Sequence, residues 1–159
     1  MQIPKRLQSL IAIPLLAILI PLAVCAFLCW LVYGFVIYGL VWVCWCIRGR
    51  RVLLVYSNSP VWHDDIDENI IPRLPENTII LNWSERKHWK RNHPFAAKVS
   101  AYFGGEREFN PMVLVFRPLH KTKVFRFWQP FRDYKHGNPA TLKETERQLF
   151  ISLGDRSTG

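Results

Sequence analysis

A short segment after Tyr56 holds the side chains best suited to bind a ligand. Two hydroxyls and an amide come first, followed by an indole, an imidazole and a carboxylate, where a strand is expected to end and a helix to begin. Free backbone amides at such a helix start attract anions, including phosphate. The same residues also fit a polar turn that caps a helix, because the segment has no glycine to let a ligand approach the backbone. The candidate ligand-binding residues here are Ser57, Asn58, Ser59, Trp62, His63 and Asp64.

Metal-ion and hydrolytic chemistry have weaker support. His63 and the four acids between Asp64 and Glu68 offer ligands for a divalent cation, but acids in the first turn of a helix are common because they stabilise its dipole. The histidines include no pair with metalloprotease spacing, and no serine lies in a nucleophile elbow. We therefore expect no metal site, no cofactor and no catalytic residue, and a binding module rather than an enzyme.

The cysteines exclude one large class of activity. Cys25, Cys29, Cys44 and Cys46 all lie in an apolar stretch near the amino terminus, and the rest of the chain has none. Thiol chemistry, a disulfide framework and a cysteine zinc site are therefore excluded from the polar part of the protein. Cys44 and Cys46 lie next to a basic segment, where they could be acylated or simply serve as small apolar residues in packing.

Basic residues alternate with aromatic residues in two stretches, 86–91 and 117–135. Such surfaces bind single-stranded nucleic acid, bind anionic lipid headgroups, or are simply solvated. Lipid is favoured over nucleic acid, because each basic residue near an anionic membrane contributes about 1 kcal/mol and the domain starts almost at the membrane. We expect one basic face against the headgroups. The membrane-surface candidates are Arg48, Arg50, Arg51, Lys87, Lys90, Arg91, Lys123 and Arg126.

The apolar stretch must position everything that follows it. No charged residue or histidine occurs from Leu7 to Ile47, whereas all 12 acidic residues lie between Asp64 and Asp155. As one straight helix this stretch would be about 60 Å long, roughly twice the hydrocarbon core of a bilayer. Two crossings would use nearly all of it, and basic residues flank it on both sides, so a hairpin with both termini in the cytoplasm is favoured.

A single long span, tilted or kinked, is the alternative for residues 7–47. No polar loop interrupts the stretch, and its prolines and glycines are tolerated in membrane helices. In both cases the larger basic cluster, Arg48 to Arg51, places the following domain in the cytoplasm, at the plasma (inner) membrane. Trp42 and Trp45 stand where an interfacial aromatic belt is expected. A cleaved signal peptide fits poorly, since its apolar region would be about 7 to 15 residues long.

Residues 51–153 predict a small α/β domain, and residues 154–159 a frayed tail. The first strand, Val52 to Tyr56, is entirely apolar and should be buried on both faces. Later strands are expected at 78–83, 112–116 and 123–129. Helices are expected at 63–74, after Ser84, up to the glycine pair 104–105, and after Pro139.

This order, βαβαββα, resembles the thioredoxin-like fold, in which the third strand follows a proline, usually cis, beside the start of the first helix. Asn110-Pro111 directly before Met112 matches that feature, which adds Pro111 to the ligand-binding candidates. The family's Cys-x-x-Cys would lie between Ser57 and His63, where this chain has no cysteine, so redox activity does not carry over. The alternative is half of a flavodoxin-like or Rossmann-like parallel sheet, which would bind or act on a phosphorylated small molecule through the same loop.

These features together predict an integral membrane protein with a cytoplasmic thioredoxin-like domain that lacks redox cysteines. Its expected role is a binding or scaffolding module at the membrane surface. The expected partners are the bilayer, through anionic headgroups, and a protein that the sequence does not name. Nucleic acid is not an expected partner, and the sequence indicates no particular oligomeric state.

Overall fold

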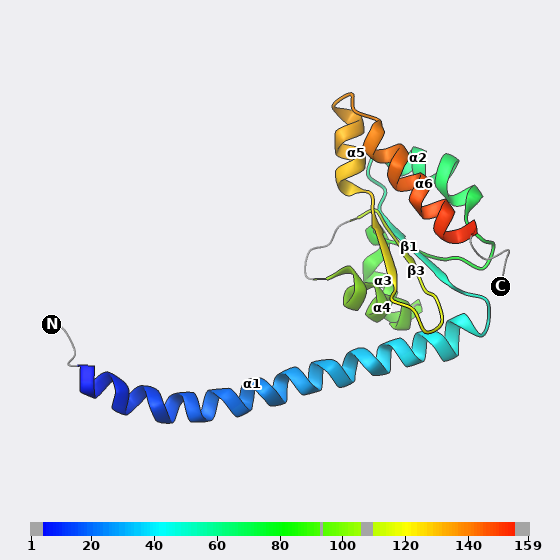
Figure 1. Cartoon of the computed structure of the whole chain (residues 1–159). Helices are drawn as coiled ribbons and strands as arrows, with labels where there is room; N and C mark the ends of the chain where they lie inside the picture. Colours follow the sequence, from blue (N-terminus) through cyan, green and yellow to red (C-terminus); the bar gives the residue numbers. More distant parts are fainter. Residues whose placement is uncertain (1–4, 93, 106–109, 155–159) are drawn as a thin grey trace. The chain divides into compact units, whose positions relative to one another are not determined.

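The computed structural model describes residues 5–92, 94–105 and 110–154 (Figure 1). The chain divides into two compact units, residues 1–39 and residues 40–159. The second unit is a mixed α/β domain that includes the last turns of the apolar stretch. Of the predicted frayed tail, only Gly154 is described, as the last residue of the final helix; residues 155–159 lie outside the described part.

The apolar stretch forms one continuous helix, so the favoured hairpin is wrong. Helix α1 runs from Lys5 to Val41 and continues as a π-helical turn, Trp42–Cys46. No polar or glycine-rich loop interrupts the sequence, so each turn extends the one before it without a break. Within the described residues, Leu15–Cys46 is the one helix long and apolar enough to cross a membrane, with a mean hydropathy of 2.8. Every side chain from Leu15 to Tyr33 is exposed.

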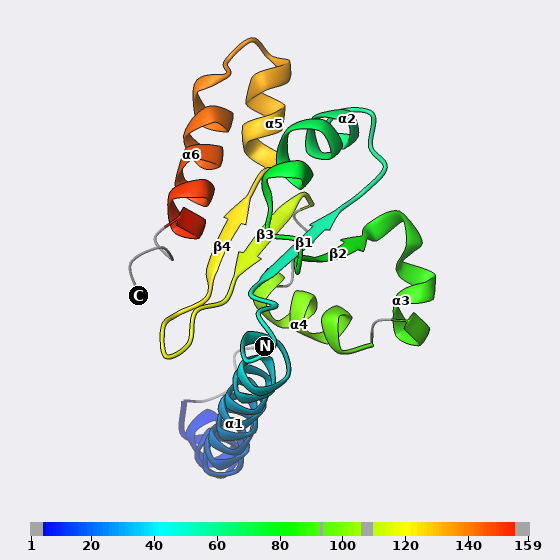
Figure 2. The same cartoon turned by 90° about the vertical axis from the view of Figure 1, so that its right-hand side faces the viewer.

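Four strands form one mixed sheet (Figure 2). They are β1 (Val52–Tyr56), β2 (Ile79–Asn82), β3 (Met112–Val115) and β4 (Lys123–Arg126), in the order β2-β1-β3-β4. Strand β2 is parallel to β1, whereas β3 is antiparallel to β1 and β4 is antiparallel to β3. The alternative of a flavodoxin-like or Rossmann-like parallel half is therefore wrong.

The two helices between β2 and β3 explain the reversed direction of β3. Helix α3 (Arg86–Asn92) follows the short turn Trp83–Glu85, and helix α4 (Pro94–Gly104) begins anew at a proline. The end of α4 lies close to the start of β3. A Cβ added to Gly104, the last residue of α4, would be only 3.0 Å from Cε of Met112, the first residue of β3. Met112 in turn pairs with Val55, so the chain enters β3 at the carboxyl end of β1. A third parallel strand would have to start at the opposite end.

The remaining helices cover the face of the sheet opposite to α4 (Figure 2). A short helical segment follows β1, made of α2 (His63–Asp65), a π-helical turn (Ile66–Ile70) and a 3-10 turn (Ile71–Arg73). Helices α5 (Trp128–Lys135) and α6 (Ala140–Gly154) end the described chain. The core on this face contains side chains from β1, β3 and all these helical segments. Its buried members are Val52, Leu54, Tyr56, Ile66, Ile70, Val113, Val115, Phe127, Phe131, Leu142 and Leu149.

Strand β1 lies at the centre of the domain, as its sequence predicts. All five of its residues are buried, which confirms the expected burial on both faces. Side chains alternate along a strand, so Val52, Leu54 and Tyr56 pack toward the α6 side while Leu53 and Val55 pack toward the α4 side. The fourth strand is shorter than predicted, since it ends at Arg126 and α5 starts two residues later.

Trp45 belongs to the core of the domain and not to an interfacial belt. Its ring packs edge-on against Phe95 at 5.0 Å and against Phe116 at 5.7 Å between centroids, and only 7% of the residue is exposed. Cys46 is also buried, which favours packing over acylation at that position. Trp42 is 44% exposed and keeps the surface position expected of it. The end of the apolar stretch is thus an integral part of the domain.

Candidate functional site

The candidate loop lies where the carboxyl ends of β1 and β2 meet. Tyr56 pairs with Asn82 in the sheet, so the segments that follow both strands start side by side. Pro111 lies at the same end, directly before Met112, and its peptide bond with Asn110 is cis. Pro111 is buried. The structure therefore brings the predicted loop and Pro111 to one end of the sheet.

Hydrogen bonds within the protein occupy most polar groups of the loop. The Asn58 backbone N–H donates to Oγ of Ser84 at 3.0 Å, and the Asn82 side-chain amide donates to Oδ1 of Asn58. The indole N–H of Trp62 donates to Oγ of Ser57 at 3.3 Å. These bonds tie the loop to the segment after β2.

Ser59 closes the turn that precedes α2. Its carbonyl accepts the backbone N–H groups of Trp62 and His63 at 3.2 and 2.9 Å, and its hydroxyl accepts that of Val61 at 3.4 Å. The backbone N–H groups of Val61, Trp62 and His63 are therefore already bonded within the protein. This geometry matches the polar turn and disfavours the phosphate site.

His63, Asp67 and Tyr56 form a small cluster beside the loop. The imidazole stacks on the Tyr56 ring at 5.9 Å, and its Nε2 lies 3.6 Å from Oδ2 of Asp67. Burial, followed by the charge of Asp67, raises the pKa of Tyr56, whose hydroxyl hydrogen bonds to the Asp67 carboxylate. Tyr56 thus stays protonated as a donor. Nδ1 of His63 is buried without a hydrogen-bond partner in the described structure, whereas the side chains of His63 and Asp67 are 36% and 42% exposed.

The acids near the loop do not converge. Asp64, Asp67 and Glu68 are exposed. Among the described residues, no three histidine, cysteine, aspartate or glutamate side chains are placed to hold a metal ion. Asp64, predicted as part of the ligand site, is therefore only an exposed member of the first turn.

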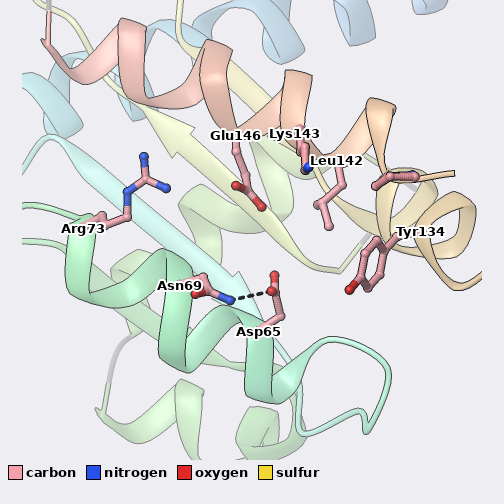
Figure 3. A pocket seen from close by; sticks show the side chains of 8 residues that line it. Asp65, Asn69, Arg73, Tyr134, Leu142, Lys143 and Glu146 are labelled. Carbon is pink, nitrogen blue, oxygen red and sulfur yellow. Dashed lines mark hydrogen bonds between the residues drawn. The ribbon is translucent and has the colours of Figure 1, made fainter. Parts of the chain in front are cut away.

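A second feature, not predicted from the sequence, is an open groove between the helical segment after β1 and α6 (Figure 3). Its volume is about 240 Å³. Asp65 accepts a hydrogen bond from Asn69 at 2.7 Å, and the Arg73 guanidinium stacks over the Phe150 ring at 3.7 Å. The residues that line the groove are Asp65, Asn69, Arg73, Tyr134, Pro139, Leu142, Lys143 and Glu146.

Glu146 lines this groove and should make the stability of the domain depend on pH. Burial, and then the charge of Asp65, raises the pKa of its carboxyl. The folded protein therefore holds this proton more tightly than the unfolded chain, whose glutamates titrate near 4.3. Stability is lost as the pH rises from about 4.3 through the raised pKa. Glu146→Gln should raise the free energy of unfolding at pH 7 and leave it unchanged at pH 3, as followed by urea titration at both pH values.

Glu144 on the same helix is the matched control. Hydrogen bonds from Arg147 and Gln148 lower its pKa to about 2, so its contribution is present above the unfolded pKa and is lost as the pH falls toward 2. Glu144→Gln should therefore change stability at pH 7 in the opposite direction. Equal effects of the two substitutions would contradict the assignment of Glu146.

An apolar hollow lies next to the candidate loop. Pro60, Val61, Tyr134 and Lys135 line a cavity of about 300 Å³ between the loop and the end of α5. Val61 is half-buried in this hollow, while Pro60 and Tyr134 are exposed. The chemistry that this end of the sheet offers is apolar contact beside a rigid polar turn.

The basic candidates do not share one face, which corrects that prediction. Lys123 and Arg126 are three positions apart on β4, so their side chains leave opposite faces of the sheet. Lys123 lines a cavity with Gln148 and Ile151 of α6, whereas Arg126 donates to the Gly104 carbonyl at 3.1 Å at the end of α4.

The positions along the sheet separate these residues as well. Arg126 pairs with Met112, which in turn pairs with Val55 near the carboxyl end of β1. Arg51 lies at the opposite end of that strand. On α3, Lys87 and Arg91 are exposed, and the Lys90 side chain lies outside the described part. Arg48 and Arg50 are exposed and Arg51 is partly buried.

Sequence reasoning missed three residues that shape the site: Tyr56, Asn82 and Ser84. Tyr56 was read only as a strand residue. The spacing of His63 and Asp67, four apart on a helix, could have suggested their contact. The bonds from Asn82 and Ser84 depend on the register between β1 and β2, for which the sequence carries no signal.

Comparisons of the chain with protein-family models, with curated proteins and with solved structures found no match.

Proposed function

We propose that α1 anchors the protein in a membrane as a single crossing. Its side chains from Leu15 to Tyr33 are apolar and exposed, and such a surface is stable in lipid but would drive association in water. The uncharged residues 7–39 of the first unit make a helix of about 50 Å, close to the full thickness of a bilayer with its headgroups, roughly 40–45 Å. A moderate tilt accommodates the difference.

The orientation follows from the basic residues at the carboxyl end of the anchor. Arg48, Arg50 and Arg51 outnumber Lys5 and Arg6, so residues 48–159 are assigned to the cytoplasm and the amino terminus to the opposite side. This replaces the arrangement with both termini in the cytoplasm, which required the hairpin.

The cytoplasmic domain is, in this proposal, thioredoxin-like. The support is the strand order β2-β1-β3-β4, in which β3 alone runs opposite to the other three strands, together with Pro111 directly before β3. It cannot work as a thiol oxidoreductase, because residues 47–159 contain no cysteine.

The domain acts, in this proposal, as a binding module at the membrane surface. The observation that carries this role is the loop after β1, where the hydroxyl oxygens of Ser57 and Ser59 and the backbone N–H groups of residues 61–63 are engaged in hydrogen bonds within the protein. What remains accessible at this end is the apolar hollow beside Val61. A protein partner that inserts an apolar side chain fits this surface better than a phosphorylated small molecule does.

Site-specific photocrosslinking of the full chain in intact cells tests the proposal. A benzophenone amino acid at Val61 should give a discrete adduct with a partner protein, whereas the same probe at Glu144, an exposed residue of α6, should not. Adducts of equal yield at both positions, or none at Val61, would contradict a binding surface beside the loop.

A further inference from the structure

The turn between β3 and β4 lies at the end of the sheet where the chain enters from the apolar stretch. Val115, the last residue of β3, pairs with Val52, the first residue of β1. The next backbone N–H, that of Phe116, donates to the Arg51 carbonyl at 2.8 Å. The following residues, 117–122, therefore project from the same end of the domain as residues 48–51 (Figure 2).

Leu119 at the tip of this turn is 86% exposed, the highest value among the large apolar side chains described. Its φ is +60°, in the left-handed region that disfavours residues with a Cβ and favours glycine or asparagine. Burial does not stabilise a leucine here, and the backbone conformation disfavours it. Neither burial nor backbone conformation in the described domain accounts for a leucine at this position.

Basic side chains surround this tip. Lys121 and Lys123 are exposed and follow Leu119 closely, while His120 is exposed and its Nδ1 lies 2.8 Å from the Pro118 carbonyl. The base of the turn is held firmly, because Arg117 donates to the Ser152 carbonyl of α6 at 2.6 Å. An apolar tip among lysines on a fixed base is suited to an anionic bilayer surface, where the leucine enters the interface and the lysines meet the headgroups.

We infer that the β3–β4 turn is a second membrane contact, in which Leu119 inserts into the headgroup region of the anionic leaflet beside Arg48 and Arg50. The inference rests on the proposed single crossing, because it places this end of the domain at the lipid surface. Its occupant is the bilayer itself, because the turn is bonded to Arg51 and Val52, which follow the proposed anchor directly in the sequence.

Spin labels on the full chain in nanodiscs with anionic lipid test this contact. The chain keeps one cysteine at a time, at Leu119→Cys, at Asn138→Cys or at native Cys25, and the other cysteines are replaced by alanine. Asn138 is an exposed loop residue after α5, which starts at the opposite end of the sheet. Collisions with oxygen relative to a water-soluble nickel chelate should be several-fold more frequent at position 119 than at 138.

The third label separates the two proposals. If oxygen collisions dominate at Cys25 but the ratio of oxygen to chelate collisions is equal at positions 119 and 138, the anchor is supported and the turn contact is overturned. Chelate-dominated collisions at Cys25 would overturn the anchor itself.

A second variant tests the turn without a label. Leu119→Asn should raise the unfolding midpoint of the full chain in neutral detergent, because asparagine tolerates the left-handed conformation. In anionic nanodiscs, residues 117–122 of the unmodified chain should exchange their amide hydrogens slowly, and the same variant should lose this protection. A lowered midpoint in detergent would show that Leu119 packs within the domain and would overturn the inference.

Discussion

Trp45→Ala should destabilise the domain by about 3–5 kcal/mol, the usual cost of removing a large aromatic side chain from a core. Trp45 is buried between Phe95 and Phe116, although it lies in the π-helical turn that ends the apolar stretch. A loss of this size is a large part of the roughly 5–15 kcal/mol that stabilises a typical domain. The measurement is the free energy of unfolding of the full chain in detergent micelles, by urea titration.

Trp42→Ala is the matched control, three residues earlier in the same stretch. Trp42 is 44% exposed, so its loss should change the stability of the domain little. The same effect from both substitutions would contradict the packing of the helix end on the domain. A fragment that begins after Trp45 should be as unstable as Trp45→Ala, since it lacks the same ring.

Exchange of Arg48 and Arg50 for glutamine should change the orientation of the anchor. Both side chains are exposed, so the domain itself should tolerate the change. Each basic residue near the cytoplasmic leaflet contributes about 1 kcal/mol, so the pair shifts the balance by about 2 kcal/mol, or roughly thirtyfold between the two orientations. Only Arg51 would then oppose Lys5 and Arg6. A reporter enzyme fused to the carboxyl terminus should detect a substantial inverted fraction.

Lysine at the same two positions is the control for this exchange. It keeps both charges and should keep the original orientation. Inversion by lysine, or no change with glutamine, would show that the basic cluster does not set the topology.

The sequence predicts the elements of the domain better than their ends. The entirely apolar run Val52 to Tyr56 predicted a strand covered on both faces, and all five residues are buried. Helix α5 was missed because Lys123 to Gln129 was read as one strand. Pro130 lies in the first turn of α5, where the N–H that proline lacks has no intrahelical acceptor, so it fits a helix start.

The predictions of a hairpin and of a single basic face were wrong for different reasons. The hairpin followed from the length of the stretch and from its two basic flanks, whereas no polar loop in the sequence reverses the chain, and α1 is continuous. The separation of Lys123 and Arg126 was predictable, because an odd spacing on a strand always gives opposite faces. The burial of Trp45 was not, since its partners lie about 50 and 70 residues further along the chain.

The position of the candidate loop at the end of β1 followed from the sequence, but the hydrogen bonds of its polar groups did not. Element order alone placed the loop after β1 near Pro111. Whether its groups are free depends on Asn82 and Ser84, which reach the loop only through the parallel register of β1 and β2. The groove lined by Asp65 and Glu146 likewise depends on how the helical segment after β1 packs beside α6.

The topology of the unmodified chain tests the central claim most directly. Single cysteines at Gln2 and Ser157, with the native cysteines replaced by alanine, are labelled in intact cells with a membrane-impermeant maleimide. The account predicts labelling at position 2 from outside, and at position 157 only after the cells are opened. Protection of both positions in intact cells, or release of the protein from membranes by alkaline carbonate, would contradict a single crossing that holds the domain at the cytoplasmic surface.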